Sequence, residues 1–155
     1  MVKINTCVFI SGKGSNLKKL ILNSNNYNFP IKIKLVISNN KKADGLKYAR
    51  KWSIPYLIIN NKLNLAEDKI LIKIKHNKVN LILLAGYMKI LSKRFIRSYG
   101  KPIINIHPSL LPKFKGLNTF EKVLQEKEKK TGCTVHFVNE KLDAGKIILK
   151  KFFYI

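Results

Sequence analysis

The segment INTCVFISGKGSNL, residues 4–17, contains the features that decide the fold class. Ile4–Ile10 is a mostly apolar run, and it is followed by a Gly-rich turn, SGKGSNL, that leads into a helical pattern. A short apolar run, a turn with glycines and then a helix are typical of the start of a βαβ unit. We therefore expect a strand at Ile4–Ile10, a helix at Asn16–Leu22, and an α/β fold.

The rest of the chain repeats this alternation, which indicates a mostly parallel sheet flanked by helices. Asn118, followed three residues later by Glu121, resembles a capping box at the start of the last helix. Further strands are expected at Ile31–Ile37, Tyr56–Ile59, Leu81–Leu84, Ile103–Ile106, Thr134–Val138 and Ile147–Phe153, and further helices at Leu46–Trp52, Ala66–His76, Lys93–Tyr99 and Thr119–Glu126.

The length of 155 residues fits a single domain, residues 1–155, with a core of its own. No apolar run reaches the roughly 18 residues of a membrane span, and the N-terminal apolar run ends in a turn rather than a signal-peptide cleavage region. Cys7 and Cys133 lie among apolar or β-branched neighbours, where reduced thiols behave as small hydrophobes. We expect a cytoplasmic protein without a disulfide or a metal site.

The net charge of +23, from 31 basic and 8 acidic residues, raises the possibility of nucleic-acid binding. However, Arg, the better bidentate reader of phosphate and guanine, occurs only at Arg50, Arg94 and Arg97. The richness in Lys, Asn and Ile fits a bias towards A/T-rich codons. We therefore do not expect a nucleic-acid partner.

The turn after the first strand is a candidate phosphate site. Gly12 and Gly14 allow a tight turn that directs N–H groups at an anion, and the start of the next helix, near Ser15 and Asn16, favours negative charge. The spacing matches neither a Walker A loop nor GxGxxG, because Leu17 replaces the third Gly. An ordinary strand-to-helix turn would also use these glycines.

A second motif, NIHPSLLP at residues 105–112, leaves a predicted strand. Asn105 and His107 are two residues apart, so on an extended chain they point to the same side. An amide N–H and an imidazolium there can stabilise the oxyanion that forms during acyl transfer. A polar strand end with a structural histidine is the alternative.

A third motif, LDAG at residues 142–145, places Asp143 in a turn between two strand-like runs. Close to His107, this carboxylate would favour the imidazolium and could relay a proton through water. A plain turn in which Asp143 binds its own backbone is the alternative. His136, between Val135 and Phe137, is expected to be a structural strand residue.

Together these motifs resemble the phosphoribosylglycinamide formyltransferase family over nearly the whole length. The resemblance implies a Rossmann-like formyltransferase fold that transfers a formyl group from 10-formyltetrahydrofolate, as co-substrate, to the amine of glycinamide ribonucleotide in purine synthesis, without a metal. The matching blocks are ISGKGSNL (10–17), VISNNKKADGLKYA (36–49), LLAGYMKIL (83–91), INIHPSLLPKFKG (104–116) and TGCTVHFVNEKLDAGKII (131–148).

The resemblance also implies residue roles. Asn105, His107 and Asp143 fall on the family's catalytic positions. The substrate-phosphate loop is matched by Gly12, Gly14, Ser15 and Asn16, and the folate-binding segment by Met88, Lys89, Ile90 and Leu91.

The sequence departs from the family at three places. Lys89 stands where Arg is usual, and Asn118 and Phe120 replace two histidines. The family continues past its last strand, so this sequence is expected to be short at the C-terminus. Alternatives are a related enzyme that acts on methionyl-tRNA or hydrolyses 10-formyltetrahydrofolate, and a degenerate, non-catalytic basic binding domain.

Overall fold

The computed structural model describes residues 2–59 and 63–155 of the chain. These residues form two compact units, Met1–Pro102 and Ile103–Ile155. The α/β class and the mostly parallel pairing predicted from the sequence are confirmed, because three strand pairs within these units are parallel and two are antiparallel.

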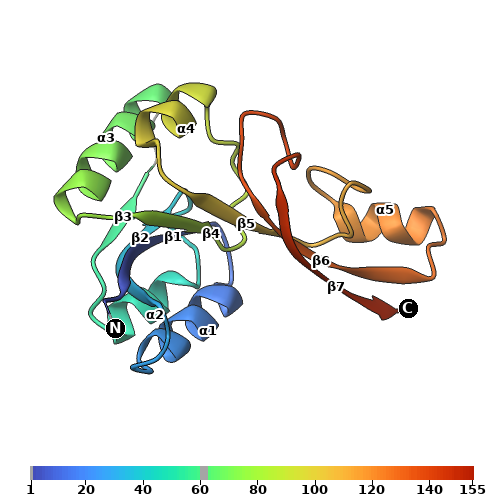
Figure 1. Ribbon diagram of the computed structural model, residues 1–155, viewed down its shortest axis with the longest axis horizontal. Coiled ribbons are helices and arrows are strands. Elements are labelled where there is room, and N and C mark those ends of the chain that lie inside the picture. Colours follow the sequence, from blue (N-terminus) through green and yellow to red (C-terminus); the bar gives the residue numbers. More distant parts are fainter. Residues whose placement is uncertain (1, 60–62) are drawn as a thin grey trace. The chain divides into compact units, whose positions relative to one another are not determined.

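The first unit is a parallel sheet with strand order β3-β2-β1-β4. Helices α1 and α2 lie on one face of this sheet, and α3 and α4 lie on the other (Figure 1). Its elements are β1 (Ile4–Ile10), α1 (Ser15–Ser24), β2 (Ile31–Ser38), α2 (Leu46–Lys51), β3 (Tyr56–Ile58), α3 (Leu63–His76), β4 (Leu81–Leu84) and α4 (Lys93–Tyr99).

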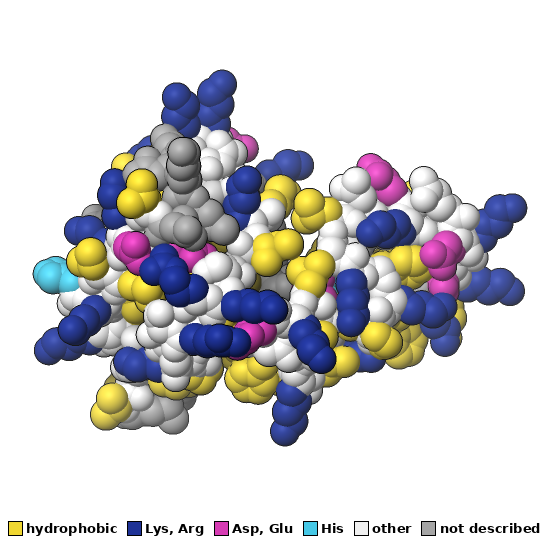
Figure 2. All heavy atoms as spheres, turned by 90° about the horizontal axis from the view of Figure 1, so that it is seen from above, with side chains coloured by type: hydrophobic (Ala, Val, Ile, Leu, Met, Phe, Trp, Pro, Cys, Tyr) yellow, Lys and Arg dark blue, Asp and Glu magenta, His cyan; other side chains and the backbone are white. Residues whose placement is uncertain are grey.

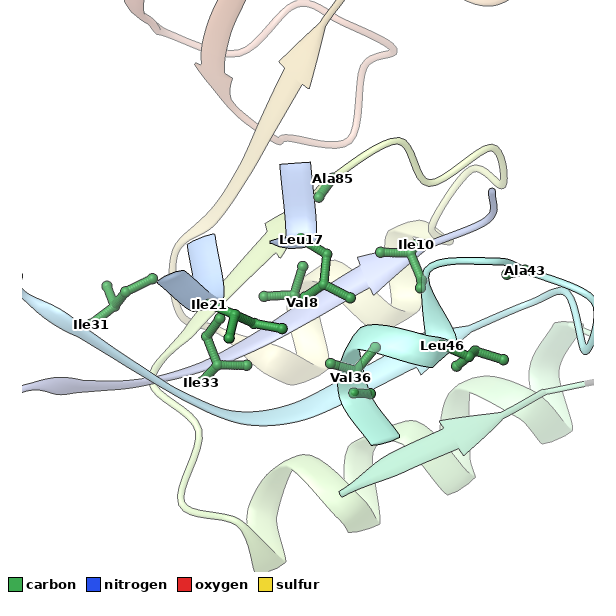
Figure 3. Close-up of a cluster of buried hydrophobic side chains, with 11 residues drawn as sticks. Val8, Ile10, Leu17, Ile21, Ile31, Ile33, Val36, Ala43, Leu46 and Ala85 are labelled. Atoms are coloured by element: carbon green, nitrogen blue, oxygen red, sulfur yellow. The ribbon is translucent and has the colours of Figure 1, made fainter. Parts of the chain in front are cut away.

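Strand β1 is apolar throughout its second half because both faces of the sheet are covered. Val8 and Ile10 belong to a buried cluster with Leu17 and Ile21 of α1 (Figure 3). Phe9 points to the opposite face, where its ring lies 6.3 Å from that of Phe95 on α4. The first strand and its two flanking layers therefore form the core that holds the following turn in place.

Helix α4 is fixed to α3 by a buried carboxylate. Ser92 caps α4 by accepting a hydrogen bond from the Phe95 N–H at 3.0 Å. Glu67 of α3, which is buried, in turn accepts bonds from the Ser92 N–H and hydroxyl, and Arg94 lies 3.9 Å from this carboxylate. These bonds satisfy a charge that would be costly to bury alone.

The second unit contains β5 (Ile103–His107), α5 (Thr119–Gln125), β6 (Lys130–Phe137) and β7 (Ile147–Tyr154), and its three strands pair antiparallel in the order β5-β6-β7. Every residue of β7 is exposed, including Phe152, Phe153 and Tyr154. Strand β7 is thus an apolar edge, interrupted by Lys150 and Lys151.

Most predicted elements lie within two residues of their observed bounds, with two larger differences and one error. Strand β6 begins at Lys130, four residues before the prediction, because Gly132 lets the backbones of β6 and β7 approach closely. Helix α3 begins at Leu63 rather than Ala66. The predicted capping box is wrong: Asn118 is left-handed (φ 57°), so its side chain makes no capping bond to α5.

Both cysteines are free, with Cys7 buried in the core and Cys133 only half-buried. Desolvation by burial raises the pKa of the Cys7 thiol well above its ordinary value. Across residues 2–59 and 63–155, no helix combines the length and the apolar character that spanning a membrane requires.

Candidate active site

The pairing of β5 with β6 brings the predicted polar residues of the second unit together. Asn105 stands directly opposite His136 in the ladder. Side chains at opposite positions share one face of a sheet, and the Asn105 Nδ2 lies 3.2 Å from the His136 Nε2. The strand pairing therefore fixes the position of the Asn105 amide.

His107, at the end of β5, lies beside Asp143, as the sequence predicts. Its Nδ1 is 3.4 Å from Asp143 Oδ2, and its Nε2 is 2.8 Å from the carbonyl oxygen of Phe114. Both ring nitrogens thus face acceptors, to which each can donate when it carries a proton. His107 is 4% exposed, so water has little access to this contact.

Asp143 is held by a backbone N–H as well as by His107. Its residue is left-handed (φ 45°), and its Oδ2 accepts a 2.8 Å hydrogen bond from the Gly116 N–H. Its Oδ1 lies 3.6 Å from His136 Nε2. The Gly116 N–H and the His107 ring therefore hold this carboxylate, and neither contact comes from Asn118 or Phe120.

His136 is the member of this cluster that the sequence did not assign. The prediction that it lies on a strand is confirmed, but its buried ring also contacts Asn105 and Asp143. Its Nδ1–H donates to the Phe137 carbonyl at 2.9 Å, which leaves Nε2 as an acceptor for the Asn105 amide. The sequence held one signal for this role. The alternation in TVHFV puts His136 on the polar face of its strand, and the polar Asn105 lies opposite it on β5.

The four side chains form what we call the Asn–His–Asp cluster: Asn105, His107, His136 and Asp143. The contact with His136 uses one of the two Asn105 amide N–H bonds, so the second can donate to a substrate oxygen. An amide donor, an imidazole and a carboxylate held in this way can stabilise an oxyanion and exchange a proton.

The predicted phosphate loop lies in the first unit, after β1. Gly14 is left-handed (φ 73°), and a Cβ there would collide with the Cα of Gly45. The Gly45 N–H donates to the Gly12 carbonyl at 3.0 Å, so two turns of the unit lock together. Gly45, which the sequence did not single out, is therefore part of this loop's support.

The start of α1 offers free donors next to this loop. The first intrahelical bond here runs from the Lys18 N–H to the Gly14 carbonyl, and no side chain of the described residues caps the helix. The N–H groups of the first turn, at Ser15 and Asn16, are thus left for another acceptor, and the helix dipole favours an anion there. Both residues are exposed.

The predicted folate segment adjoins the loop through Ser11. The Ser11 hydroxyl accepts a bond from the Met88 N–H at 2.8 Å and donates to Asn39 Oδ1 at 2.6 Å. Met88, Lys89 and Ile90 are exposed, whereas Leu91 is buried. Exposed apolar side chains on a fixed loop are typical of a ligand-binding surface.

Tyr87, which directly precedes this segment, packs against the core. Its ring packs edge-on against Phe9 at 5.2 Å between centroids. Burial, and then the nearby Glu67 carboxylate, raises the pKa of Tyr87 to about 12, so its hydroxyl stays protonated at neutral pH. No group of three His, Cys, Asp or Glu side chains suited to a metal ion occurs among the residues described.

Known proteins of one family are similar to this chain. The family described as "Formyl transferase" matches residues 4–155. The phosphoribosylglycinamide formyltransferase of Haemophilus influenzae is 43% identical over 148 residues, which cover 92% of this chain and 69% of that protein. The human trifunctional purine biosynthetic protein adenosine-3 is 43% identical over 96% of this chain, which spans only 15% of its length.

A solved structure shows the same similarity in three dimensions. The phosphoribosylglycinamide formyltransferase of Anaplasma phagocytophilum matches with a TM-score of 0.92 and 39% identity, over 99% of this chain and 73% of that one. Because sequence, fold and relatives agree, this chain belongs to the formyl transferase family and, within it, to the phosphoribosylglycinamide formyltransferases.

Proposed function

We propose that this protein transfers the formyl group of 10-formyltetrahydrofolate to the amine of glycinamide ribonucleotide. The observation that carries the proposal is the Asn–His–Asp cluster, in which an amide, two imidazoles and a carboxylate lie within 3.6 Å of one another in successive pairs. The named activity of the relatives supports the choice of substrates. Both units serve one formyltransferase domain, since the family match runs through both.

The proposed reaction begins when the amine nitrogen attacks the formyl carbon and forms a C–N bond. The carbonyl electron pair moves to oxygen, and the Asn105 amide and the His107 imidazolium stabilise this oxyanion. Collapse restores the C=O bond, breaks the bond to the folate nitrogen and releases tetrahydrofolate. Asp143 accepts the proton lost by the amine, directly or through water, and the folate nitrogen gains one.

The Phe114 carbonyl bears on this mechanism. It accepts the His107 Nε2–H at 2.8 Å, so the formyl oxygen must compete with this carbonyl for the same proton donor. Phe114 is left-handed (φ 55°) and lies in the segment between β5 and α5. We propose that this segment yields when substrate binds.

The other site residues have separate roles in the proposal. The turn with Gly12, Gly14, Ser15 and Asn16 binds the ribonucleotide phosphate, supported by the free donors at the start of α1. Met88, Lys89, Ile90 and Leu91 bind the folate, largely through main chain. No metal takes part, and the two free cysteines fit a reducing compartment such as the cytoplasm.

The test is an assay of the purified protein with both substrates. Formation of formylglycinamide ribonucleotide together with an equal amount of tetrahydrofolate supports the proposal. Release of tetrahydrofolate without a formylated product would indicate a hydrolase, and formylation of methionyl-tRNA alone would indicate the related transferase. Folate binding without turnover of any of these substrates would leave a non-catalytic binding domain.

A further inference from the structure

The predicted folate segment, residues 88–91, has no regular secondary structure, although it joins two ordered elements of the first unit. It lies between β4, which ends at Leu84, and α4, which begins at Lys93. The side chains of Met88 and Ile90 are 63% and 68% exposed, so their packing does little to hold the segment in place. Its conformation therefore depends largely on hydrogen bonds to its main chain.

The Ser11 hydroxyl fixes the first end of this segment. Ser11 directly follows β1 and is 7% exposed. Its oxygen accepts a bond from the Met88 N–H at 2.8 Å, across 77 positions of the sequence. The same hydroxyl donates to Asn39 Oδ1 at 2.6 Å, and a hydroxyl that donates becomes a stronger acceptor. The end of β1, the residue after β2 and the folate segment are therefore joined at one oxygen atom.

The Glu67 carboxylate fixes the other end. Glu67 is 1% exposed and accepts bonds from the N–H and the hydroxyl of Ser92, the residue directly after the segment. Between the two ends, the N–H groups of Lys89 and Ile90 make no hydrogen bond to any residue that the structure describes. Two buried side chains thus hold the ends of the segment and leave two main-chain donors at exposed positions for a ligand.

Ser11 also begins the turn with the predicted phosphate site, but its main chain is held there by other bonds. Asn40 Nδ2 donates to the Ser11 carbonyl at 3.1 Å. Ile10, the preceding residue, pairs with Ser38 of β2. Loss of the Ser11 hydroxyl therefore removes the bond to Met88 without releasing the main chain of the turn. The two proposed substrate sites meet at Ser11, yet only the folate segment depends on its side chain.

We propose that Ser11 is a positioning residue, which acts through Met88 and preorganises residues 88–91 for the folate co-substrate. This inference rests on the proposed function, because that function assigns residues 88–91 to the folate. A segment that is fixed before binding loses little conformational freedom when the ligand arrives, so it binds more tightly than a mobile one. Since Glu67 still holds Ser92, loss of the Ser11 hydroxyl loosens the segment from its first end alone.

The experiment measures the binding of each ligand separately in the full chain. Calorimetry gives the dissociation constants of tetrahydrofolate and of glycinamide ribonucleotide, and amide hydrogen exchange reports on the main chain. The test variants are Ser11→Ala, which deletes the hydroxyl, and Ser11→Cys, which fills its place with a weakly hydrogen-bonding thiol. Ser24→Ala is the matched control, because it removes a serine hydroxyl that donates to the Ile21 carbonyl at the end of α1.

We expect Ser11→Ala to raise the dissociation constant of tetrahydrofolate about five- to tenfold, because the Met88 N–H loses its acceptor. The dissociation constant of the ribonucleotide should change less than about twofold, since the turn keeps its other bonds. Ser11→Cys should resemble Ser11→Ala. In both variants hydrogen exchange should become faster at the Met88 amide and stay unchanged at the Ser92 amide. Ser24→Ala should bind both ligands like the wild type.

Three results would overturn the positioning role and leave the proposed function standing. These are equal weakening of both ligands by Ser11→Ala, wild-type affinity for tetrahydrofolate in either Ser11 variant, and an unchanged exchange rate of the Met88 amide. The first would show that Ser11 supports the turn as a whole, and the second that its hydrogen bond does not matter for the folate. A wild-type protein that binds no tetrahydrofolate would instead overturn the proposed function, and the positioning role with it.

Discussion

At the scale of single residues, the proposed mechanism makes His107 and Asp143 one unit, so their substitutions should not add. His107→Ala removes an oxyanion donor and should lower turnover by about 10² to 10³. Asp143→Asn should be nearly as severe because it withdraws the charge facing His107 Nδ1. The double variant should lose little more than either single variant, measured as turnover per folded molecule beside the melting temperature.

The choice of asparagine matters, because Asp143 is left-handed and Asn tolerates that conformation better than Ala. His76→Ala and Asp68→Asn are matched controls, since both side chains are exposed on or at the end of α3. If the His107→Ala protein melts earlier but turns over like the wild type, His107 is a structural histidine and the proposed mechanism is wrong.

We propose that His136 is a positioning residue that acts through Asn105. His136→Ala removes the acceptor that orients the Asn105 amide, so kcat should fall about tenfold or more while KM for both substrates changes little. In an Asn105→Ala background the same change should have almost no further effect on kcat. Additive losses in this double-mutant cycle would show that His136 acts independently of Asn105.

At the scale of elements, the turn between β1 and α1 contains two glycines, Gly12 and Gly14, that have different surroundings. Gly14→Ala forces a Cβ against Gly45 at a left-handed position and should destabilise the fold by about 1 to 3 kcal/mol. Gly12→Ala meets no atom within 4 Å, so it should leave the melting temperature unchanged and raise KM for the ribonucleotide alone.

This pair also defines the control. Gly14→Val, the obvious test of a phosphate loop, would confuse damage to the loop with loss of binding, whereas Gly12→Ala does not. Steady-state KM values for both substrates, with urea unfolding of each variant, distinguish the two effects. Equal rises in KM for ribonucleotide and folate in Gly12→Ala would speak against the phosphate assignment.

The elements also show how far the sequence predicts this structure. Strands such as β1 and β4 were predicted correctly because apolar runs bounded by turns have a clear signature. The prediction of a capping box at Asn118 was wrong because the motif does not specify the φ angle of Asn118, which is left-handed here. Gly45 was not singled out, and His136 was predicted only as a structural strand residue, for a shared reason: each contacts a residue that is distant in the sequence, Gly14 or Asn105.

At the scale of the whole molecule, like-charge repulsion should make stability depend on salt. Lys and Arg side chains are spread over the face shown in Figure 2. Because 31 basic residues outnumber 8 acidic residues, the average interaction between charges is repulsive. Raising the ionic strength from about 0.01 M to 0.15 M shortens the screening length from roughly 30 Å to 8 Å, and the melting temperature should rise.

Screening also weakens favourable ion pairs such as Arg94–Asp68, but exposed pairs contribute little. Sodium chloride and sodium fluoride at equal ionic strength should therefore give the same increase in a thermal melt. A melting temperature that falls with salt would mean that favourable pairs outweigh the repulsion, and an effect of one anion alone would point to specific ion binding.

The exposed apolar side chains of β7 have a consequence for how the protein behaves at high concentration. An edge strand with Phe152, Phe153 and Tyr154 exposed to solvent is a site at which protein molecules can aggregate. Lys150 and Lys151 on the same strand, and the excess positive charge of every copy, keep the copies apart while salt is low. Added salt therefore stabilises each folded molecule but weakens the repulsion between molecules. Concentrated samples should remain free of aggregates only over a limited range of ionic strength.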